Sequence, residues 1–377
     1  MLTAFVHGRI LTDAGFATGH AVLSANGRIT AIVAADAVPI HAKIIDLHGG
    51  TLLPGFIDVQ VNGGGGVLFN DAPTVAGLRA IAVAHARFGT TGLLPTIIST
   101  DLATIAKAIA AVDEAIASDV PGILGIHIEG PYLSPKRRGI HNPKEFPPLD
   151  AAAINVLSSL KRGKTLVTMA PDATTPDDIA ALVKAGVIVS VGHSDASYEQ
   201  VKAALKAGAR GFTHLFNAMS PLAQRAPGVV GAALDDTESW CGLIADGHHV
   251  HPAALRIAYA CRGADKLMLV TDAMPPVGSD QQVFVLQGRT MRVENGCCYG
   301  PDGTLAGSAT DMATIVKKAV EYLNIDLPTA SRLASTNAAA FLGLENEMGR
   351  IAAGVRADFV LLDDTLSVRQ TFIGGVP

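Results

Sequence analysis

The sequence predicts an α/β fold, a (β/α)8 TIM barrel with a small discontinuous β-sandwich domain that the two termini form. From residue 52 onward, apolar strand-like runs alternate with Ala-rich stretches of helical length, which is typical of a parallel sheet with crossover helices. Eight such runs occur, and eight parallel strands close a barrel. Both ends of the chain contain short strand-like segments and turns, so we expect them to pair with each other.

Residues 1–50 are expected to form the first part of the small domain. Gly, Asn and Asp residues break this stretch into short alternating segments, and Asn26-Gly27 is a strong turn signal. The expected strands lie at 4–12, 20–24, 29–33 and 43–46. The pattern indicates a small antiparallel β unit.

The barrel is expected to occupy residues 51–345. Its eight strands are expected at 53–60, 91–96, 123–129, 165–170, 187–193, 211–214, 241–246 and 267–272. Helical patterns lie between them at 74–88, 102–118, 176–185, 197–207 and 252–261, with Thr74 and Ser197 as N-caps. A β-like excursion at 275–304 precedes two further helices at 311–323 and 328–342. Residues 346–377, with their clearest strand at 358–362, are expected to complete the small domain.

Composition excludes several classes of partner. The chain carries 29 basic and 34 acidic side chains, a formal net charge of -5, and 49% of its residues are hydrophobic. No block of Lys or Arg provides the basic patch that nucleic acid or an anionic membrane surface would need. We therefore expect a small-molecule partner, no nucleic acid and no membrane.

Cysteine usage and the first residues indicate a cytoplasmic protein. The chain has 4 cysteines, and two of them, Cys297 and Cys298, are adjacent, which gives neither a disulfide framework nor a CxxC metal site. His7, Arg9 and Asp13 interrupt what would have to be the apolar part of a signal peptide. No uncharged apolar run reaches the ~18 residues that cross a bilayer.

The residues that close the expected strands are unusually polar. Active sites of β/α barrels lie at the carboxyl ends of the strands. The polar residues found there are Gln60, Asn62, Glu129, His193, His214, Asp246, His249 and Asp272. Glu129, His193 and His214 come from separate strands and form a three-ligand set that suits a divalent metal with a position open for water. A single histidine at a strand end is more often a hydrogen-bonded core or surface group, but the combination favours ligation.

Asp272 closes the last expected strand. A carboxylate there is placed to take a proton from a metal-activated water and to return it to a leaving group. The alternative is a turn or helix cap, although a Pro-rich loop follows it. The remaining histidines of the β unit and of the first helix are interpreted as structural or surface groups; they are His7, His20, His41, His48 and His85.

Six segments resemble a known family. They are LPGFID at 53–58, GIHIEGP at 125–131, GHSDA at 192–196, THLFNAM at 213–219, ADGHHV at 245–250 and LVTDAM at 269–274. In this order they resemble the motifs of the N-acetylglucosamine-6-phosphate deacetylase family of the amidohydrolase superfamily. The resemblance covers nearly the whole chain. PGFID and the DAM-type aspartate are shared across the superfamily, whereas HIEGP, THLFNAM and ADGxHV are specific to this deacetylase family.

The resemblance implies a role for each matching residue at the metal. Glu129, His193 and His214 would hold the catalytic ion, and Asp272 would be the general base and acid. His141, in the HNP segment, would contact the acetamide oxygen of the substrate. The alternative for His141 is a role in stabilising its loop.

The same resemblance implies contacts to the rest of the substrate. Asn217 and Ala218 would bind near the sugar phosphate, and His249 would contact that phosphate. Arg225 would reach it from the neighbouring subunit of a homodimer. The alternative for Arg225 is a solvent-exposed side chain.

One departure from many amidohydrolases concerns the number of metal ions. The His-x-His that supplies a second ion after the first strand is replaced by Gln60-Val61-Asn62, and amides are poor ligands beside imidazole. The fourth strand ends in Met169-Ala170 without the lysine that could be carbamylated to bridge two ions. The resemblance is therefore to members with one divalent ion per subunit. Zinc is expected first, and iron, cobalt and manganese suit the same donors.

The expected reaction is hydrolysis of the acetamide of N-acetyl-D-glucosamine 6-phosphate to D-glucosamine 6-phosphate and acetate, in amino-sugar catabolism and cell-wall recycling. Another single-metal amidohydrolase, such as a deaminase or a D-amino-acid deacylase, is the nearest alternative, but a deaminase should carry His-x-His on the first strand. A catalytically silent sugar-phosphate binding protein is the alternative of another class. Such a protein would have no physical need for both Asp272 and the full ligand set.

Overall fold

The computed structural model describes residues 1–377, and a parallel eight-stranded barrel sheet lies at the centre of its larger part. Its strands are, in spatial order, β8 (Phe56–Val61), β11 (Thr90–Ile98), β12 (Gly125–Glu129), β13 (Lys164–Met169), β14 (Ile188–Val191), β15 (Gly211–Phe212), β16 (Trp240–Leu243) and β17 (Leu267–Leu269). Each strand pairs in parallel with the next. A parallel bridge between Val61 and Ala273 joins the two end strands, so the expected barrel is confirmed.

Several barrel strands end earlier than the sequence predicts. His193, His214 and Asp272 have φ angles of 47°, 34° and 51°, in the left-handed region that interrupts an extended strand. The expected strands 187–193, 211–214 and 267–272 therefore stop at Val191, Phe212 and Leu269. Non-glycine residues are held in this region only where their surroundings impose it, and such residues cluster at functional sites.

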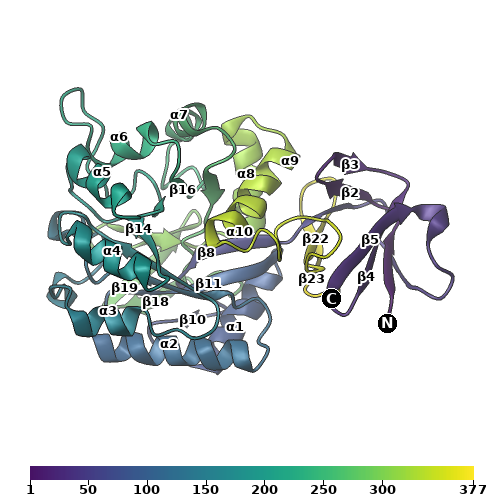
Figure 1. Cartoon of the computed structure of the whole chain (residues 1–377), viewed down its shortest axis with the longest axis horizontal. Helices are drawn as coiled ribbons and strands as arrows, with labels where there is room; N and C mark the ends of the chain where they lie inside the picture. Colours follow the sequence, from purple (N-terminus) through teal and green to yellow (C-terminus); the bar gives the residue numbers. More distant parts are fainter.

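Helices cover the outside of the barrel (Figure 1). Those that follow the expected pattern are α1 (Val75–Ala86), α2 (Leu102–Ala117), α4 (Pro176–Lys184), α5 (Tyr198–Lys206), α7 (Pro252–Arg262) and α8 (Met312–Leu323). Thr74 caps α1 through the Gly77 amide, and Ser197 forms a capping box with Gln200 at the start of α5. Both expected caps are therefore confirmed.

Two helices were missed and one expected helix is divided. The missed helices are α3 (Ala151–Leu157) and α6 (Gly228–Asp235). The expected helix at 328–342 consists of α9 (Leu327–Ala334) and α10 (Thr336–Leu342). Ser335, with φ −136° and ψ −72°, leaves the helical region between them, and its hydroxyl donates to the Ser331 carbonyl.

The two termini form a small domain of two sheets beside the barrel (Figure 1). One sheet contains β5 (Arg28–Ala34), β4 (His20–Ala25), β1 (Thr3–Val6) and β6 (Lys43–Asp46). The other contains β23 (Val368–Phe372), β22 (Phe359–Leu362), β7 (Thr51–Pro54), β2 (Arg9–Thr12) and β3 (Gly15–Ala17). Phe5 packs edge-on against Phe359 and Phe372, with ring centroids 5.1 Å apart in each pair. These contacts join the N-terminal and C-terminal segments in one core, as expected.

Three details of the small domain correct the sequence-based prediction. The unit is not purely antiparallel, because β1 pairs with β6 and β2 pairs with β7 in parallel. The expected strand at 4–12 is two strands, separated at His7, which has a φ of 58°. The expected strand at 53–60 is divided between β7 in the small domain and β8 in the barrel. The small sheets thus extend past residue 50, and the division of the chain at 50/51 and 345/346 stays a prediction.

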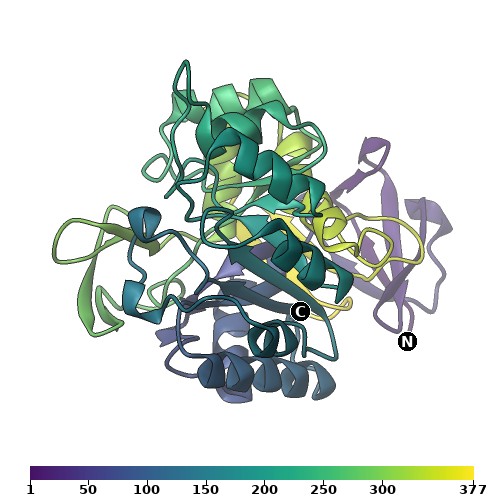
Figure 2. The same ribbon diagram turned by 60° about the vertical axis from the view of Figure 1, so that its left-hand side comes forward.

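The excursion after the last barrel strand is a four-stranded antiparallel sheet that projects from the barrel (Figure 2). It contains β18 (Val283–Leu286), β19 (Arg289–Glu294), β20 (Cys297–Tyr299) and β21 (Leu305–Ser308). Phe284 and Leu286 pack with Ile140, and the Gln287 amide hydrogen-bonds to Ser99 and Asn142. The sheet therefore borders the loop that follows β12. No helix in the chain is long and apolar enough to cross a bilayer.

Candidate active site

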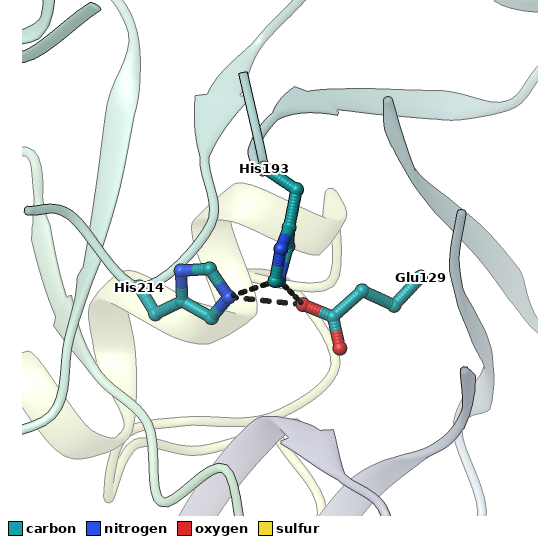
Figure 3. Close-up of side chains that lie close together, drawn as sticks. All are labelled: Glu129, His193 and His214. Atoms are coloured by element: carbon teal, nitrogen blue, oxygen red, sulfur yellow. Dashed lines mark hydrogen bonds and ion pairs between the residues drawn. The ribbon is translucent and has the colours of Figure 1, made fainter. Parts of the chain in front are cut away.

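Glu129, His193 and His214 converge at the carboxyl end of the barrel (Figure 3). Glu129 is the last residue of β12, and the histidines follow the ends of the neighbouring strands β14 and β15. Glu129 Oε1 lies 3.0 Å from His214 Nε2 and 3.3 Å from His193 Nε2, and the two Nε2 atoms are 3.1 Å apart. All three side chains are buried.

The donor chemistry of this cluster fits a divalent cation. His193 Nδ1 lies 2.9 Å from the Arg137 carbonyl oxygen, which can only accept, so Nδ1 carries the ring proton. In neutral His193 the Nε2 atom then presents a lone pair toward Glu129 Oε1 and His214 Nε2. A carboxylate oxygen and two imidazole Nε2 atoms that lie this close together, one of them with its lone pair turned inward, suit a cation between them. A carbonyl on the far ring nitrogen is also the usual support of a metal-binding histidine.

Electrostatics within the cluster favour an ionised Glu129. Burial opposes the charged form, but the interactions of the carboxylate with the two neighbouring imidazoles, His193 and His214, outweigh burial and hold the pKa of Glu129 well below its usual range. Glu129 therefore provides a full negative charge to this corner of the barrel.

Asp272 faces the cluster and is held by two amides. Asn62 Nδ2 donates to Asp272 Oδ1 at 2.6 Å, and Gln60 Nε2 donates to the same oxygen and to Glu129 Oε1, at 3.2 Å each. Burial, and then the charge of Glu129, raises the pKa of Asp272. Gln60 and Asn62 occupy the positions at which a second metal ion would need histidine ligands. Here their amides donate hydrogen bonds instead, to the carboxylates of Glu129 and Asp272.

A cavity of about 340 Å³ opens onto this centre. Among the residues predicted from the sequence, those that line it are Asn62, Glu129, His141, His193, His214, Asn217, Ala218, His249 and Asp272. Arg225 does not line it, because it lies on an exposed loop before α6. The structure thus brings together every predicted site residue except Arg225.

His141 and His249 are each fixed by a buried partner. His141 Nδ1 is 2.7 Å from the Ser99 hydroxyl, and its ring packs edge-on against His193 at 4.5 Å between centroids. Burial, and then the nearby His193, lowers the pKa of His141 to about 3. His249 Nδ1 is 2.6 Å from Asp246 Oδ2.

Two groups that line the cavity were missed from the sequence. Lys136 and Arg137 lie on the loop after β12 and form ion pairs with Asp195, at 3.1 and 2.8 Å. The basic run Lys136-Arg137-Arg138 beside HNP was a usable signal for them. Residues 304–307 also line the cavity, where an added Cβ on Gly307 would lie 2.7 Å from the Asp272 carbonyl oxygen. No sequence signal marked these residues, because their position depends on how the excursion folds back.

Comparison with known proteins agrees with this geometry. The model of the amidohydrolase family matches residues 51–377. The chain belongs to the amidohydrolase family. Amidohydrolases are metal-dependent, in agreement with the cluster of Glu129, His193 and His214 as a candidate metal site.

Two relatives and one solved structure show how close the similarity is. The chain is 45% identical to an N-acetylgalactosamine-6-phosphate deacetylase of Shewanella sp. (strain ANA-3), over 87% of this chain and 83% of the relative. It is 36% identical to an N-acetylglucosamine-6-phosphate deacetylase of Haemophilus influenzae, over 93% and 92% of the two chains. The crystal structure of an N-acetylglucosamine-6-phosphate deacetylase from Pasteurella multocida superposes with a TM-score of 0.96 at 36% identity, covering 100% of this chain and 99% of that one. This amidohydrolase thus shares its whole architecture with sugar-phosphate deacetylases.

Proposed function

We propose that this amidohydrolase removes the acetyl group of N-acetyl-D-glucosamine 6-phosphate, giving D-glucosamine 6-phosphate and acetate in amino-sugar catabolism and cell-wall recycling. What supports the proposal most is the position of Asp272 opposite Glu129, His193 and His214, in a cavity that also holds His141 and His249. The names of the relatives point to the same reaction.

One divalent ion per subunit is proposed at Glu129, His193 and His214. Such an ion would supply Lewis acidity and a water that ionises near neutral pH. Zinc is the first choice, and iron, cobalt and manganese suit the same oxygen and nitrogen donors. The amides of Gln60 and Asn62 support a single ion, because they already donate to Asp272.

Asp272 is proposed as the general base and acid. In its ionised form it would accept the proton of the attacking water, and as the C–N bond breaks it would return that proton to the amine. Burial and the charge of Glu129 raise the pKa of Asp272. A carboxyl group with a raised pKa can both accept and release a proton nearer neutral pH, which suits this exchange.

His141 is proposed to hold the acetamide oxygen. With a pKa lowered to about 3, mainly by burial, His141 is neutral at working pH. If its Nδ1 accepts from the Ser99 hydroxyl at 2.7 Å, the ring proton is on Nε2, available as a donor in the cavity. A fixed donor at the developing oxyanion lowers the barrier.

The remaining contacts are proposed to bind the sugar phosphate, with Asn217 and Ala218 near it and His249 on it. Arg225 would come from the partner in a homodimer. The Arg225 side chain is exposed and lies outside the cavity of its own subunit, which supports this. An apolar groove between the Arg225 loop and α7, where Leu222 is 57% and Ile257 is 55% exposed, supports it too. Exposed apolar side chains of this kind mark interfaces. We propose the cytoplasm as the compartment, which four free thiols support.

A second candidate substrate is N-acetyl-D-galactosamine 6-phosphate. The relative at 45% identity carries that activity in its name, whereas relatives named for the glucosamine compound lie at 35–37%. The two substrates differ only in the configuration at C4, so the same metal centre would serve both.

The test is acetate release by purified protein that has been stripped of metal and reconstituted with zinc. Three substrates are compared: the two sugar 6-phosphates and unphosphorylated N-acetylglucosamine. Metal-dependent release from the glucosamine compound, with far less release from the unphosphorylated sugar, supports the proposal. Preference for the galactosamine compound transfers the assignment to the second candidate, and no release from either phosphate contradicts both.

A further inference from the structure

A buried aspartate stands behind His249, on the side away from the cavity. Asp246 Oδ2 accepts from His249 Nδ1 at 2.6 Å, while Asp246 Oδ1 accepts from the backbone amides of His248 and His249, at 2.9 and 2.8 Å. The side chains of Asp246 and His249 are 0% and 3% exposed. Asp246 thus fixes both the loop and the ring.

The groups around this pair leave Asp246 ionised. Burial opposes its charge, but hydrogen bonds from His249 and from the two amides outweigh burial and lower its pKa to about 2. Cys297 Sγ is 3.5 Å from Oδ2, and the Lys318 ammonium donates to the Asp246 carbonyl oxygen at 2.8 Å. Asp272 also interacts electrostatically with His249.

The outer nitrogen of His249 has no partner within the protein. His249 Nε2 is buried without a hydrogen bond, and the residue lines the cavity. Because a carboxylate oxygen only accepts, Nδ1 must carry a proton, and Nε2 of the neutral ring is then an acceptor. A phosphate dianion is also an acceptor, so it can pair with Nε2 only when that atom carries a second proton.

We propose that Asp246 is a positioning residue that obliges His249 to take up a proton when the sugar phosphate binds. This rests on the proposed function, in which His249 contacts the phosphate. The ring then lies between two anions, the Asp246 carboxylate and the phosphate, and donates to each. The same geometry would allow Nε2 of the neutral ring to accept from a sugar hydroxyl, and in that case binding takes up no proton at His249.

Proton uptake separates these two cases. The zinc-loaded enzyme is titrated with D-glucosamine 6-phosphate by calorimetry at about pH 8, where the phosphate is already a dianion. Buffers of different ionisation enthalpy give the number of protons taken up. Protons exchanged by the sugar amine and the metal centre are common to wild type and variants, so the difference between proteins reports His249.

The informative variant is Asp246→Asn. The carboxamide oxygen of the new side chain can still accept from the backbone amides of His248 and His249. Its NH2 group donates to His249 Nδ1, so the ring proton of His249 is on Nε2. The neutral ring can then donate to phosphate without gaining a proton. We expect uptake about one proton lower than in wild type, and affinity about tenfold weaker because a charged donor is lost. Cys297→Ser, which keeps a donor to Asp246, should match wild type.

A second variant keeps the inference falsifiable if Asp246→Asn folds poorly. His249→Gln removes the ring and should show the same loss of proton uptake, with bound zinc measured as the check on folding. Equal uptake by wild type and by a folded variant that binds the ligand overturns the inference. Acetate release by wild type distinguishes that result from failure of the proposed function, in which neither release nor binding occurs and both proposals fall.

Discussion

Three side chains around the metal centre are each held by a group from another part of the chain. The Arg137 carbonyl fixes His193, Ser99 holds His141, and Asn62 holds Asp272. Side chains held in this way lose little freedom when substrate binds, so their geometry is already suited to reaction.

Replacement of Asp272 by Asn should separate metal binding from turnover. The amide keeps the shape of the side chain but cannot take the proton of the attacking water. We expect bound zinc near the wild-type level and kcat lower by about 10²–10⁴-fold. Metal analysis and acetate release measure the two quantities, and turnover close to wild type would refute the assigned role.

Replacement of Asn62 by Ala should shift the pH dependence. The Asn62 hydrogen bond lowers the pKa of Asp272, so its loss raises that pKa further. The base form of Asp272 is needed for attack, and the acid limb of the kcat/KM profile should therefore move to higher pH. Asn155→Ala, at an exposed position of α3, is the control and should leave the profile unchanged. An Asn62→Ala limb at the wild-type position would contradict this coupling.

The sequence predicted which residues lie at the site but not which groups hydrogen-bond to their side chains. Glu129, His193 and His214 could be predicted because strand ends of a barrel meet at one face. The contact of Ser99 with His141 could not, because it depends on the path of a loop and on a rotamer, neither of which leaves a periodic pattern. Arg225 lies outside the cavity of its own chain, so its predicted contact stays untested.

The loop after β12 supports the metal centre from one side. Ion pairs from Lys136 and Arg137 to Asp195 hold it against the segment that follows β14. The carbonyl of Arg137 then meets His193 Nδ1, so one residue anchors the loop by its side chain and orients a proposed ligand by its backbone.

Loss of this anchor should weaken metal binding. In Asp195→Ala the loop loses both ion pairs, and the Arg137 carbonyl is no longer held against His193. We expect zinc affinity to fall by about 10-fold, because loss of groups behind a metal ligand costs about 10–100-fold. Competition with a chelator measures the zinc affinity of both proteins. Asp265→Ala, which breaks an exposed ion pair with Arg332, is the control and should have no effect.

Element boundaries were predictable where local chemistry sets them. Thr74 and Ser197 begin helices as expected because their hydroxyls satisfy free amides. The break at Ser335 and the strand ends ahead of His193 and Asp272 were not predictable, because tertiary contacts impose the backbone conformations of these residues. α6 was missed because it is short and begins at Gly228 without a side-chain cap.

In the whole molecule, the small domain depends on a core shared by both ends of the chain. Phe5 is fully buried and touches Phe359 and Phe372. Because this core is separate from the barrel mouth, its stability and the activity should respond to different substitutions.

Replacement of Phe5 by Ala should test this separation. Removal of a buried ring typically lowers the free energy of unfolding by about 3–5 kcal/mol. We expect a lower Tm of the small domain and a kcat near wild type at temperatures where the variant is folded. Ile44→Ala, at a 51% exposed position of the same domain, is the control and should change Tm little. A large loss of kcat in folded Phe5→Ala protein would show that the two regions are coupled.

The barrel sheet closes at the bridge between Val61 and Ala273, where the amides of Asn62 and Gly63 donate to the Ala273 carbonyl and where Thr271 donates to the Asp58 carboxylate. Asp272 sits directly beside this seam, while the proposed ligands lie on the continuous side of the ring. A small opening of the seam would disturb the hydrogen bonds of Asp272 with Gln60 and Asn62, and with them the position of the proton carrier relative to the metal centre. The rate of hydrogen exchange at the Asn62 and Gly63 amides would therefore report how often the seam opens and Asp272 leaves its catalytic position.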